Sequence, residues 1–304
     1  MMQTMYPIQK ESRSEFVPIR QLQYHVRQWG TPDTETPPLV MVHGWMDVSA
    51  SFQFVVDALA QDRWVIAPDW RGFGLTETPN QDNYWFPDYL ADLDFLLDHY
   101  VGARSIHLVG HSMGGHIAML YAGVRPERVA KLVNLEGFGM AATRPAQAAG
   151  RYAKWIDALK TMHRGELDLK PYANVEGVAQ RLMKTNPRLQ SDKAHWLAGH
   201  WARPNAAGEW RILGHAAHKI INAQLFKVDE VVGIYERITA PTLLAISDAD
   251  SLSGWWKEKF TLDEFKQRIM AVPNLRQAVI ADAGHMLHHD QPEAVARLIE
   301  EFLA

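Results

Sequence analysis

The chain has 304 residues, of which 47% are hydrophobic and 22% are charged. This composition is that of an ordinary globular protein, and it excludes a disordered, collagen-like or fibrous chain. The 31 Lys and Arg residues against 35 Asp and Glu give a formal charge of −4 without any block of basic residues. Such a charge pattern lacks the basic patch of a nucleic-acid binder, so no nucleic-acid partner is expected.

Two further absences narrow the class of protein. The chain contains no cysteine, which excludes disulfides, cysteine nucleophiles and thiolate-bound metals. It has no run of about 18 consecutive apolar residues, and its first thirty residues carry basic side chains without the apolar segment of a signal peptide. We therefore expect a cytoplasmic protein with no membrane partner, present as a monomer or a homodimer.

Short apolar runs rich in β-branched residues alternate with longer helical patterns along the chain. This alternation predicts an α/β fold with a mostly parallel central sheet flanked by crossover helices. An opening antiparallel pair is expected over residues 16–20 and 22–28. Further strands are predicted at 39–43, 64–69, 106–110, 129–135, 242–247 and 276–281, and helices at 51–60, 89–100, 113–123, 262–270 and 293–303.

The alternation stops between residues 138 and 235. This stretch shows helical patterns at 151–162, 175–183 and 192–202, and no strand comparable to the others. A structureless loop of that length is implausible inside a compact domain. The sequence therefore predicts a helical insert at 138–235, between two parts of one core at 1–137 and 236–304.

The strongest local signal for chemistry is the segment Gly110-His111-Ser112-Met113-Gly114-Gly115. It follows a predicted strand and opens a predicted helix, which is the setting that the G-x-S-x-G nucleophile elbow requires. Small residues on both sides let the chain turn tightly enough to present the hydroxyl above the sheet. We therefore predict that Ser112 is a nucleophile.

A serine hydroxyl is a weak nucleophile at neutral pH, so it needs a base and a group that orients the base. His285 lies in the loop between the last predicted strand and the last helix, where its side chain can reach the carboxyl ends of the strands. We predict His285 as the base. The neighbouring His288 and His289 are interpreted as structural or surface residues.

The carboxylate that orients the base has several candidates. Asp250 follows the strand 242–247 and gives the chain order serine, acid, histidine that this kind of site uses. Glu136 ends the preceding strand and is its main rival. Asp248 and Asp282 rank after these two as candidates. We predict Asp250 as the acid.

An acyl-transfer site also needs hydrogen-bond donors directed at the developing oxyanion. The backbone N–H of Met113 lies at a helix N-terminus directly after the nucleophile. The turn after the strand 39–43 supplies a second donor, most simply the N–H of Trp45. These two amides are the predicted oxyanion hole.

With these motifs in order, the chain resembles the proteins of the α/β-hydrolase fold over essentially its whole length. Within that superfamily, two segments are similar to the serine-hydrolase-like proteins of the esterase and lipase type: 43–47 with Ser51-Phe52, and 181–187. The resemblance implies a helical cap over the site at 138–235, and it favours Asp250 over Glu136 as the acid. Ser247 departs from the pattern, because a glycine is common in this turn. The segments that carry the superfamily resemblance are 43–45, 68–74, 110–115, 241–250, 284–286 and 291–293.

Apolar residues of the cap are expected to line the substrate site together with the strand-end histidine. A cap packs on its own core and also faces the cleft, so only some of its tryptophans and methionines can contact a substrate. No metal or cofactor is expected, because the histidine pairs of the insert lack an H-E-x-x-H pattern and no glycine-rich phosphate loop occurs. The predicted substrate-binding residues are His43, Met140, Trp155, Met183 and Trp210.

These residues predict a serine hydrolase that cleaves a carboxylic ester of an apolar or aromatic small molecule through an acyl-enzyme on Ser112. A serine at the elbow argues against the relatives of this fold that use an aspartate nucleophile. The same triad also serves carbon–carbon bond hydrolases, lactonases and perhydrolases, which stay open. A cofactor-free dioxygenase of this fold and a non-catalytic ligand-binding member are further alternatives.

Overall fold

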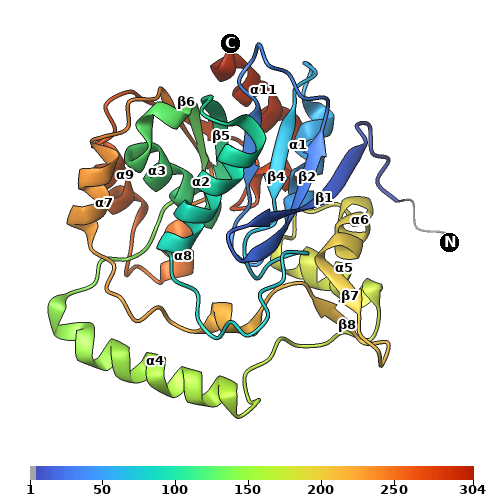
Figure 1. Cartoon of the computed structure of the whole chain (residues 1–304), viewed down its shortest axis with the longest axis vertical. Helices are drawn as coiled ribbons and strands as arrows, with labels where there is room; N and C mark the ends of the chain where they lie inside the picture. Colours follow the sequence, from blue (N-terminus) through green and yellow to red (C-terminus); the bar gives the residue numbers. More distant parts are fainter. Residues whose placement is uncertain (1–4) are drawn as a thin grey trace.

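The computed structural model describes residues 5–304, and the first four positions of the predicted core range 1–137 lie outside it. Eight strands form one sheet in the order β1-β2-β4-β3-β5-β6-β9-β10 (Figure 1). Strand β2 pairs antiparallel with β1 and β4, whereas the other neighbours in this sheet are parallel. The strands are β1 Ser12–Ile19, β2 Leu22–Trp29, β3 Leu39–Val42, β4 Val65–Pro68, β5 Ile106–His111, β6 Val129–Leu135, β9 Thr242–Ser247 and β10 Leu275–Ile280.

Helices cover both faces of the sheet. Buried residues of α2, α3, α7 and α9 form one apolar cluster on one face, and those of α1 and α11 form a second cluster on the other. Short helices complete the connections. The helices that cover the sheet or complete its connections are η1 Ser49–Phe52, α1 Gln53–Ala58, α2 Pro87–Val101, α3 Met113–Val124, η2 Pro126–Arg128, α7 Val228–Tyr235, α8 Ser251–Trp256, α9 Leu262–Ile269, α10 Leu287–Asp290 and α11 Pro292–Leu303.

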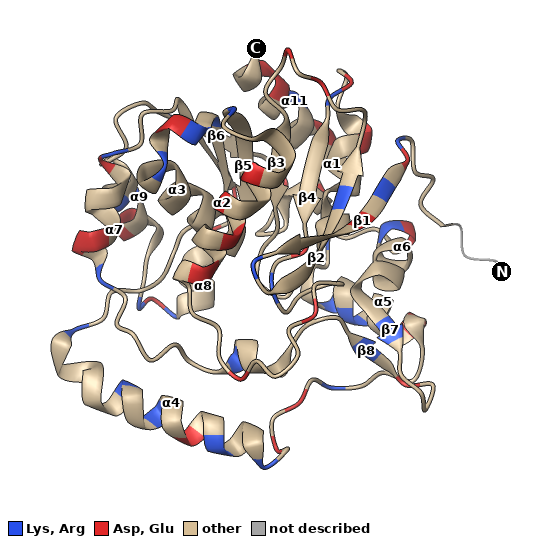
Figure 2. Ribbon diagram, viewed as in Figure 1, with Lys and Arg blue, Asp and Glu red and all other residues tan. Residues whose placement is uncertain are grey.

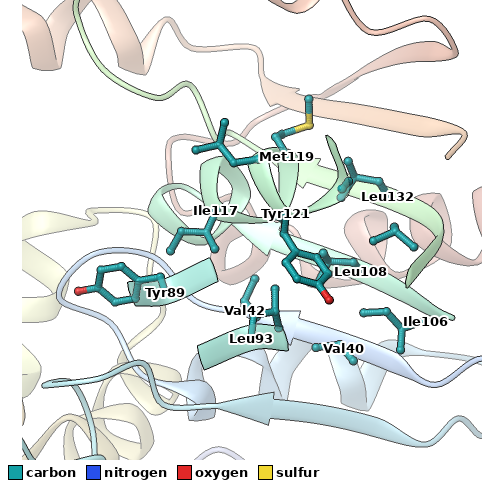
Figure 3. Close-up of a cluster of buried hydrophobic side chains, with 14 of the residues drawn as sticks. Val40, Val42, Tyr89, Leu93, Ile106, Leu108, Ile117, Met119, Tyr121 and Leu132 are labelled. Atoms are coloured by element: carbon teal, nitrogen blue, oxygen red, sulfur yellow. The ribbon is translucent and has the colours of Figure 1, made fainter. Parts of the chain in front are cut away.

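Strand β3 shows why the predicted apolar runs become central strands. Val40 and Val42 belong to the cluster under α2 and α3, whereas Leu39 and Met41 belong to the cluster under α1 and α11. Successive side chains of a strand point to opposite faces, so a strand covered on both sides must be apolar throughout. Figure 3 shows the first of these clusters, in which Val42 lies near Leu93 of α2 and Ile117 of α3, and Val40 lies near Ile106 of β5. The predicted α/β fold class is confirmed.

The insert is less uniform than predicted. Besides the predicted helices it contains a short two-stranded antiparallel sheet, which the sequence does not predict. Its last helix, α7, places Val231 and Tyr235 in the main core cluster. Helix α4 has no buried residue and runs along the lower edge of the view in Figure 1. The elements before α7 are η3 Pro145–Gln147, α4 Ala148–His163, α5 Val175–Thr185, α6 Ser191–Trp201, β7 Ala202–Pro204, β8 Trp210–Ile212 and η4 Ala216–Lys219.

Charge is distributed unevenly between core and insert. Residues 138–235 carry 14 Lys and Arg against eight Asp and Glu, although the whole chain is slightly acidic. Figure 2 shows positive residues along α4 and on β7 and β8, and acidic ones on α2 and α7. No helix within residues 5–304 is long and apolar enough to cross a bilayer.

A buried histidine of the central sheet predicts a pH-dependent stability. Burial, helped by the nearby Arg63 and Lys131, lowers the pKa of His107 to about 4 from 6.5. Between these values an unfolded chain binds a proton that the folded chain does not, so the free energy of unfolding falls as the pH falls. The slope from this one group is at most about 1.4 kcal/mol per pH unit.

We expect His107→Gln to flatten the dependence of the unfolding free energy on pH between about 6.5 and 4. Urea unfolding of both proteins at several pH values measures the two slopes. The rest of the chain is the same in both proteins, so only the difference in slope is informative. Parallel curves for the two proteins would contradict the prediction.

Candidate active site

Ser112 lies between the end of β5 and the first residue of α3. Its backbone has φ 51° and ψ −116°, a conformation that non-glycine residues rarely adopt outside functional turns. A Cβ on Gly110 would lie 2.4 Å from the carbonyl oxygen of Gly114, and a Cβ on Gly114 would lie 2.2 Å from that of Val42. Glycine at both positions therefore allows the tight turn that presents Ser112, as the sequence predicts.

His285 connects Ser112 with a carboxylate. Its Nε2 lies 2.9 Å from Ser112 Oγ, and its Nδ1 lies 2.9 Å from Glu136 Oε2. In the tautomer that suits both contacts, the serine hydroxyl donates to Nε2 and Nδ1–H donates to the carboxylate. The His285 side chain is 35% exposed, so a small molecule can reach the serine and histidine side of this chain. The ring of Phe138 stacks nearby, with centroids 6.3 Å apart.

Glu136 is buried at the end of β6 and accepts four hydrogen bonds. Its Oε1 accepts from the backbone N–H and the hydroxyl of Ser247, both at 2.7 Å. Its Oε2 accepts from Ser251 Oγ at 2.5 Å and from His285. Because the side chain is only 1% exposed, this set of donors replaces the water that a carboxylate needs.

The predicted contact between Asp250 and His285 is wrong. Asp250 is exposed and caps α8, where its Oδ1 accepts the backbone N–H of Ser253 at 2.9 Å. The alternative acid, Glu136, makes the contact instead. The turn after β9 carries Ser247 where a glycine is common in this fold, and the Ser247 hydroxyl serves the carboxylate of the neighbouring strand. Serine in place of glycine at position 247 is the one sequence signal that Glu136, and not Asp250, contacts His285.

The other two acidic alternatives hold the loops together. The Asp248 carboxylate accepts the backbone N–H groups of Asp282 at 2.9 Å and of Ala283 at 3.2 Å. These bonds lower the pKa of Asp248. Asp248 thereby links the turn after β9 to the loop that carries His285. Neither Asp248 nor Asp282 hydrogen-bonds to the His285 ring in the described chain, whose Nδ1 is held by Glu136.

The two predicted oxyanion donors flank Ser112. Met113 is the first residue of α3, so its N–H has no acceptor within the helix. The turn after β3 passes close to Ser112, since a Cβ on Gly44 would lie 3.1 Å from Ser112 Cβ. The N–H of Trp45, the next residue, has no acceptor among the residues that the structure describes. The Trp45 side chain is 43% exposed.

His43 does not line the site as predicted. Its side chain is fully buried, its Nε2 accepts the backbone N–H of Trp70 at 2.9 Å, and its Nδ1 donates to the carbonyl oxygen of Gly44 at 2.8 Å. Burial lowers the pKa of His43, which keeps the ring neutral. Both ring nitrogens are therefore occupied in joining the loops after β3 and β4, and no group is left for a substrate.

The four predicted substrate residues of the insert lie in different surroundings. Met140 follows Phe138 in the loop after β6, where its carbonyl oxygen accepts from Arg268 at 2.7 Å. Trp155 on α4 donates to Asn83 Oδ1 at 3.0 Å. Met183 and Trp210 pack against the small cluster that joins α5 and α6 to the segment after β3. Their contact with a substrate stays a prediction.

One hollow of the structure lies away from this site. It has a volume of about 740 Å³ and lies beside the amino ends of β3 and β4, lined by Trp29, Trp64 and the loop 30–36. Ser112 and His285 belong to the opposite, carboxyl edge of the parallel strands. Ligands of open α/β sheets bind at that edge.

The chain belongs to the alpha/beta hydrolase fold family, whose model matches residues 37–292. A serine hydrolase-like protein of Danio rerio is 27% identical over 97% of this chain and 89% of its own length. A cis-3-alkyl-4-alkyloxetan-2-one decarboxylase of Shewanella oneidensis is 37% identical over 88% of this chain and 81% of its own. The esterase YbfF of Escherichia coli is 28% identical over 88% of this chain and 92% of its own length.

Proposed function

We propose that this protein is a serine hydrolase that cleaves a carboxylic ester of an apolar or aromatic small molecule. The observation that carries the proposal is the continuous hydrogen-bonded chain from Glu136 through His285 to Ser112, with both links at 2.9 Å. A nucleophile, a base within hydrogen-bond reach and a group that orients the base together define a site for acyl transfer. Relatives named serine hydrolase-like and esterase support the same class.

In this proposal His285 Nε2 takes the proton of Ser112 as Oγ attacks the ester carbonyl. The N–H groups of Trp45 and Met113 donate to the oxyanion, and Glu136 stabilises the imidazolium while it holds the tautomer. His285 then gives its proton to the leaving alcohol. Water attacks the acyl-enzyme with His285 again as the base, which frees the acid and restores Ser112.

The insert is proposed to act as a lid that selects the acyl or aromatic group. Two backbone bonds tie it to the loop after β4, from Gly74 N–H to the Leu213 carbonyl oxygen and from His215 N–H to that of Gly72, each at 2.8 Å. The loop after β4 begins at the carboxyl end of its strand, which is the edge of the main sheet at which Ser112 lies. Met140, Trp155, Met183 and Trp210 are its proposed apolar contacts.

A panel of p-nitrophenyl and naphthyl esters of increasing acyl length tests the proposal, run beside labelling with a fluorophosphonate probe. We expect one probe per chain at Ser112, turnover of several esters, and faster turnover of neutral esters than of anionic ones of equal size. No labelling and no turnover would indicate a non-catalytic member of the fold. Faster turnover of the anionic esters would instead indicate that the basic residues of the insert select the substrate.

A lactone is a second candidate substrate, because the oxetan-2-one in the name of the Shewanella relative is a four-membered cyclic ester. Ser112 would open such a ring by the same attack on the carbonyl, and both halves of the substrate would stay joined in the acyl-enzyme. Lactones of four to six ring atoms therefore belong in the panel. Turnover of lactones without turnover of open-chain esters would favour this candidate.

A further inference from the structure

A compact group of metal-binding side chains lies beside the proposed active site. Asp47, His288 and His289 each offer one donor atom, and these atoms lie within 4.8 Å of one another. The three side chains are at most 3% exposed. Asp47 follows the turn at Trp45 by two residues, and the two histidines belong to α10, three and four residues after His285.

Several polar atoms in this group have no protein partner. Asp47 Oδ2, both ring nitrogens of His288 and Nε2 of His289 are buried without a hydrogen bond within residues 5–304. Buried polar atoms are nearly always satisfied, so several orphans side by side need a common explanation. A single ligand between them would satisfy the carboxylate and both imidazoles at once.

The charge of the group points to a cation. The only basic side chain within ion-pair distance of the Asp47 carboxylate in the described chain is His288, with Nε2 3.8 Å from Oδ2. A carboxylate this deeply buried needs a compensating positive charge. Water would satisfy the hydrogen bonds but would bring no charge, whereas a metal ion would coordinate the unpartnered atoms and also supply positive charge.

We propose that Asp47, His288 and His289 bind one divalent transition-metal ion, with zinc as the best match. Two imidazoles and one carboxylate are a donor set that zinc uses in proteins. Zinc holds such ligands with neighbouring donor atoms about 3.3 Å apart. The Asp47–His288 pair, at 3.8 Å, would therefore need to close by about half an ångström, and the other donor atoms, which lie within 4.8 Å of one another, by at most about 1.5 Å. The sequence predicts no metal, because the histidine pairs of the insert lack a ligand pattern; the ligands proposed here come from the turn after β3 and from α10, which are far apart in sequence.

The surroundings of Asp47 suit a metal ligand. Its Oδ1 accepts from the Val48 N–H at 2.9 Å, from Trp201 Nε1 at 3.0 Å and from the Ser51 hydroxyl. These bonds fix the carboxylate and leave Oδ2 for the ion, as outer hydrogen bonds do for ligands in known sites. Trp201 ends α6, so the insert takes part in orienting this ligand.

The ion would join three segments whose relative positions matter for the proposed mechanism. They are the turn that carries Trp45, the loop that carries His285, and helix α6 of the insert. A third imidazole extends this link, since the His111 ring lies 4.2 Å from that of His288 and its Nε2 donates to the carbonyl oxygen of His285 at 2.8 Å. The site is structural and does not depend on which bond the enzyme cleaves.

The test begins with the wild-type chain. Because the ligands are buried, the protein is unfolded and refolded with zinc or with a chelator, and each sample is then passed through gel filtration. We expect about one zinc per chain to be retained in the first sample and a higher thermal midpoint than in the second. A wild-type chain that retains no zinc and has the same midpoint in both samples overturns the proposal.

A matched pair of variants separates this site from surface binding. His289→Gln should weaken zinc binding at least about 100-fold, because losing a ligand costs more than losing one of its outer partners. His107→Gln, at a buried histidine with an unpartnered ring nitrogen outside the group, should bind zinc as the wild type does. Equal zinc retention by both variants overturns the proposal.

If His289→Gln does not fold, crystals of the wild type grown with zinc decide the question. Anomalous scattering at the zinc edge should show a peak between Asp47 and the two histidines. A peak only at surface histidines, or a water molecule in that place, overturns the proposal.

Discussion

Ser112→Ala is expected to reduce kcat for the best ester of the panel by about 10³-fold or more, with an unchanged fold. Removing a nucleophile of this kind removes the acyl-enzyme route, and only the background supplied by the oxyanion donors and substrate binding is left. The side chain is only partly buried and, within residues 5–304, its hydroxyl bonds only to His285, so alanine leaves no unsatisfied core group. Steady-state kinetics and a thermal unfolding curve measure the two effects.

Ser253→Ala is the control for this variant. Ser253 is also partly buried at the start of a helix, and the acceptor of its backbone N–H, Asp250, is unaffected by the change. It should keep full activity and full labelling by the fluorophosphonate, whereas Ser112→Ala should lose the label. If Ser112→Ala retains more than about a tenth of the wild-type kcat, another group is the nucleophile.

The positions of Ser112 and His285, the proposed nucleophile and base, could be predicted from the sequence because local features define them. The glycines around Ser112 are required by contacts with Gly114 and Val42 that any chain making this turn would have. His285 follows the last strand, which sets it at the carboxyl edge whatever the rest of the fold does. The structure brings these two residues into hydrogen-bond contact.

The acid could not be chosen from the sequence because two adjacent strands compete for the same place. Strands β6 and β9 are neighbours in the sheet, with Leu135 paired to Ala245, so Glu136 and the turn after β9 both end near the histidine. Which carboxylate reaches it depends on the path of one turn. In this chain Glu136 adopts φ 54° and turns inward, and Asp250 starts a helix at the surface.

The surroundings of the site are harder still to predict, because they depend on contacts between distant segments. His43 follows a strand just as catalytic residues do, yet both nitrogens of its ring are hydrogen-bonded to the backbone of Trp70 and Gly44. The sequence leaves open whether His288 and His289 are structural or surface residues, and only the packing of α10 against the segment after β3 shows them as buried. Helical periodicity places residues on elements and does not tell which of them meet across the fold.

Glu136→Gln is expected to lower kcat by about 10⁴-fold, whereas Asp250→Asn should change it less than about twofold. The amide that this substitution introduces has nearly the shape of the carboxylate, and its oxygen can still accept from Ser247. Its NH₂ group, however, would face His285 Nδ1 and favour the tautomer that carries the proton on Nε2. That nitrogen could then no longer accept the proton of Ser112, and the imidazolium would lose its counter-charge.

The two variants are measured side by side with the same ester, together with their thermal midpoints. The surface location of Asp250 limits the effect of Asp250→Asn to the cap of α8, where asparagine serves nearly as well. Comparable stability of the two proteins would therefore assign a loss in kcat to the chemistry. A large loss for Asp250→Asn with full activity for Glu136→Gln would mean that the turn after β9 rearranges when substrate binds and that Asp250 becomes the acid.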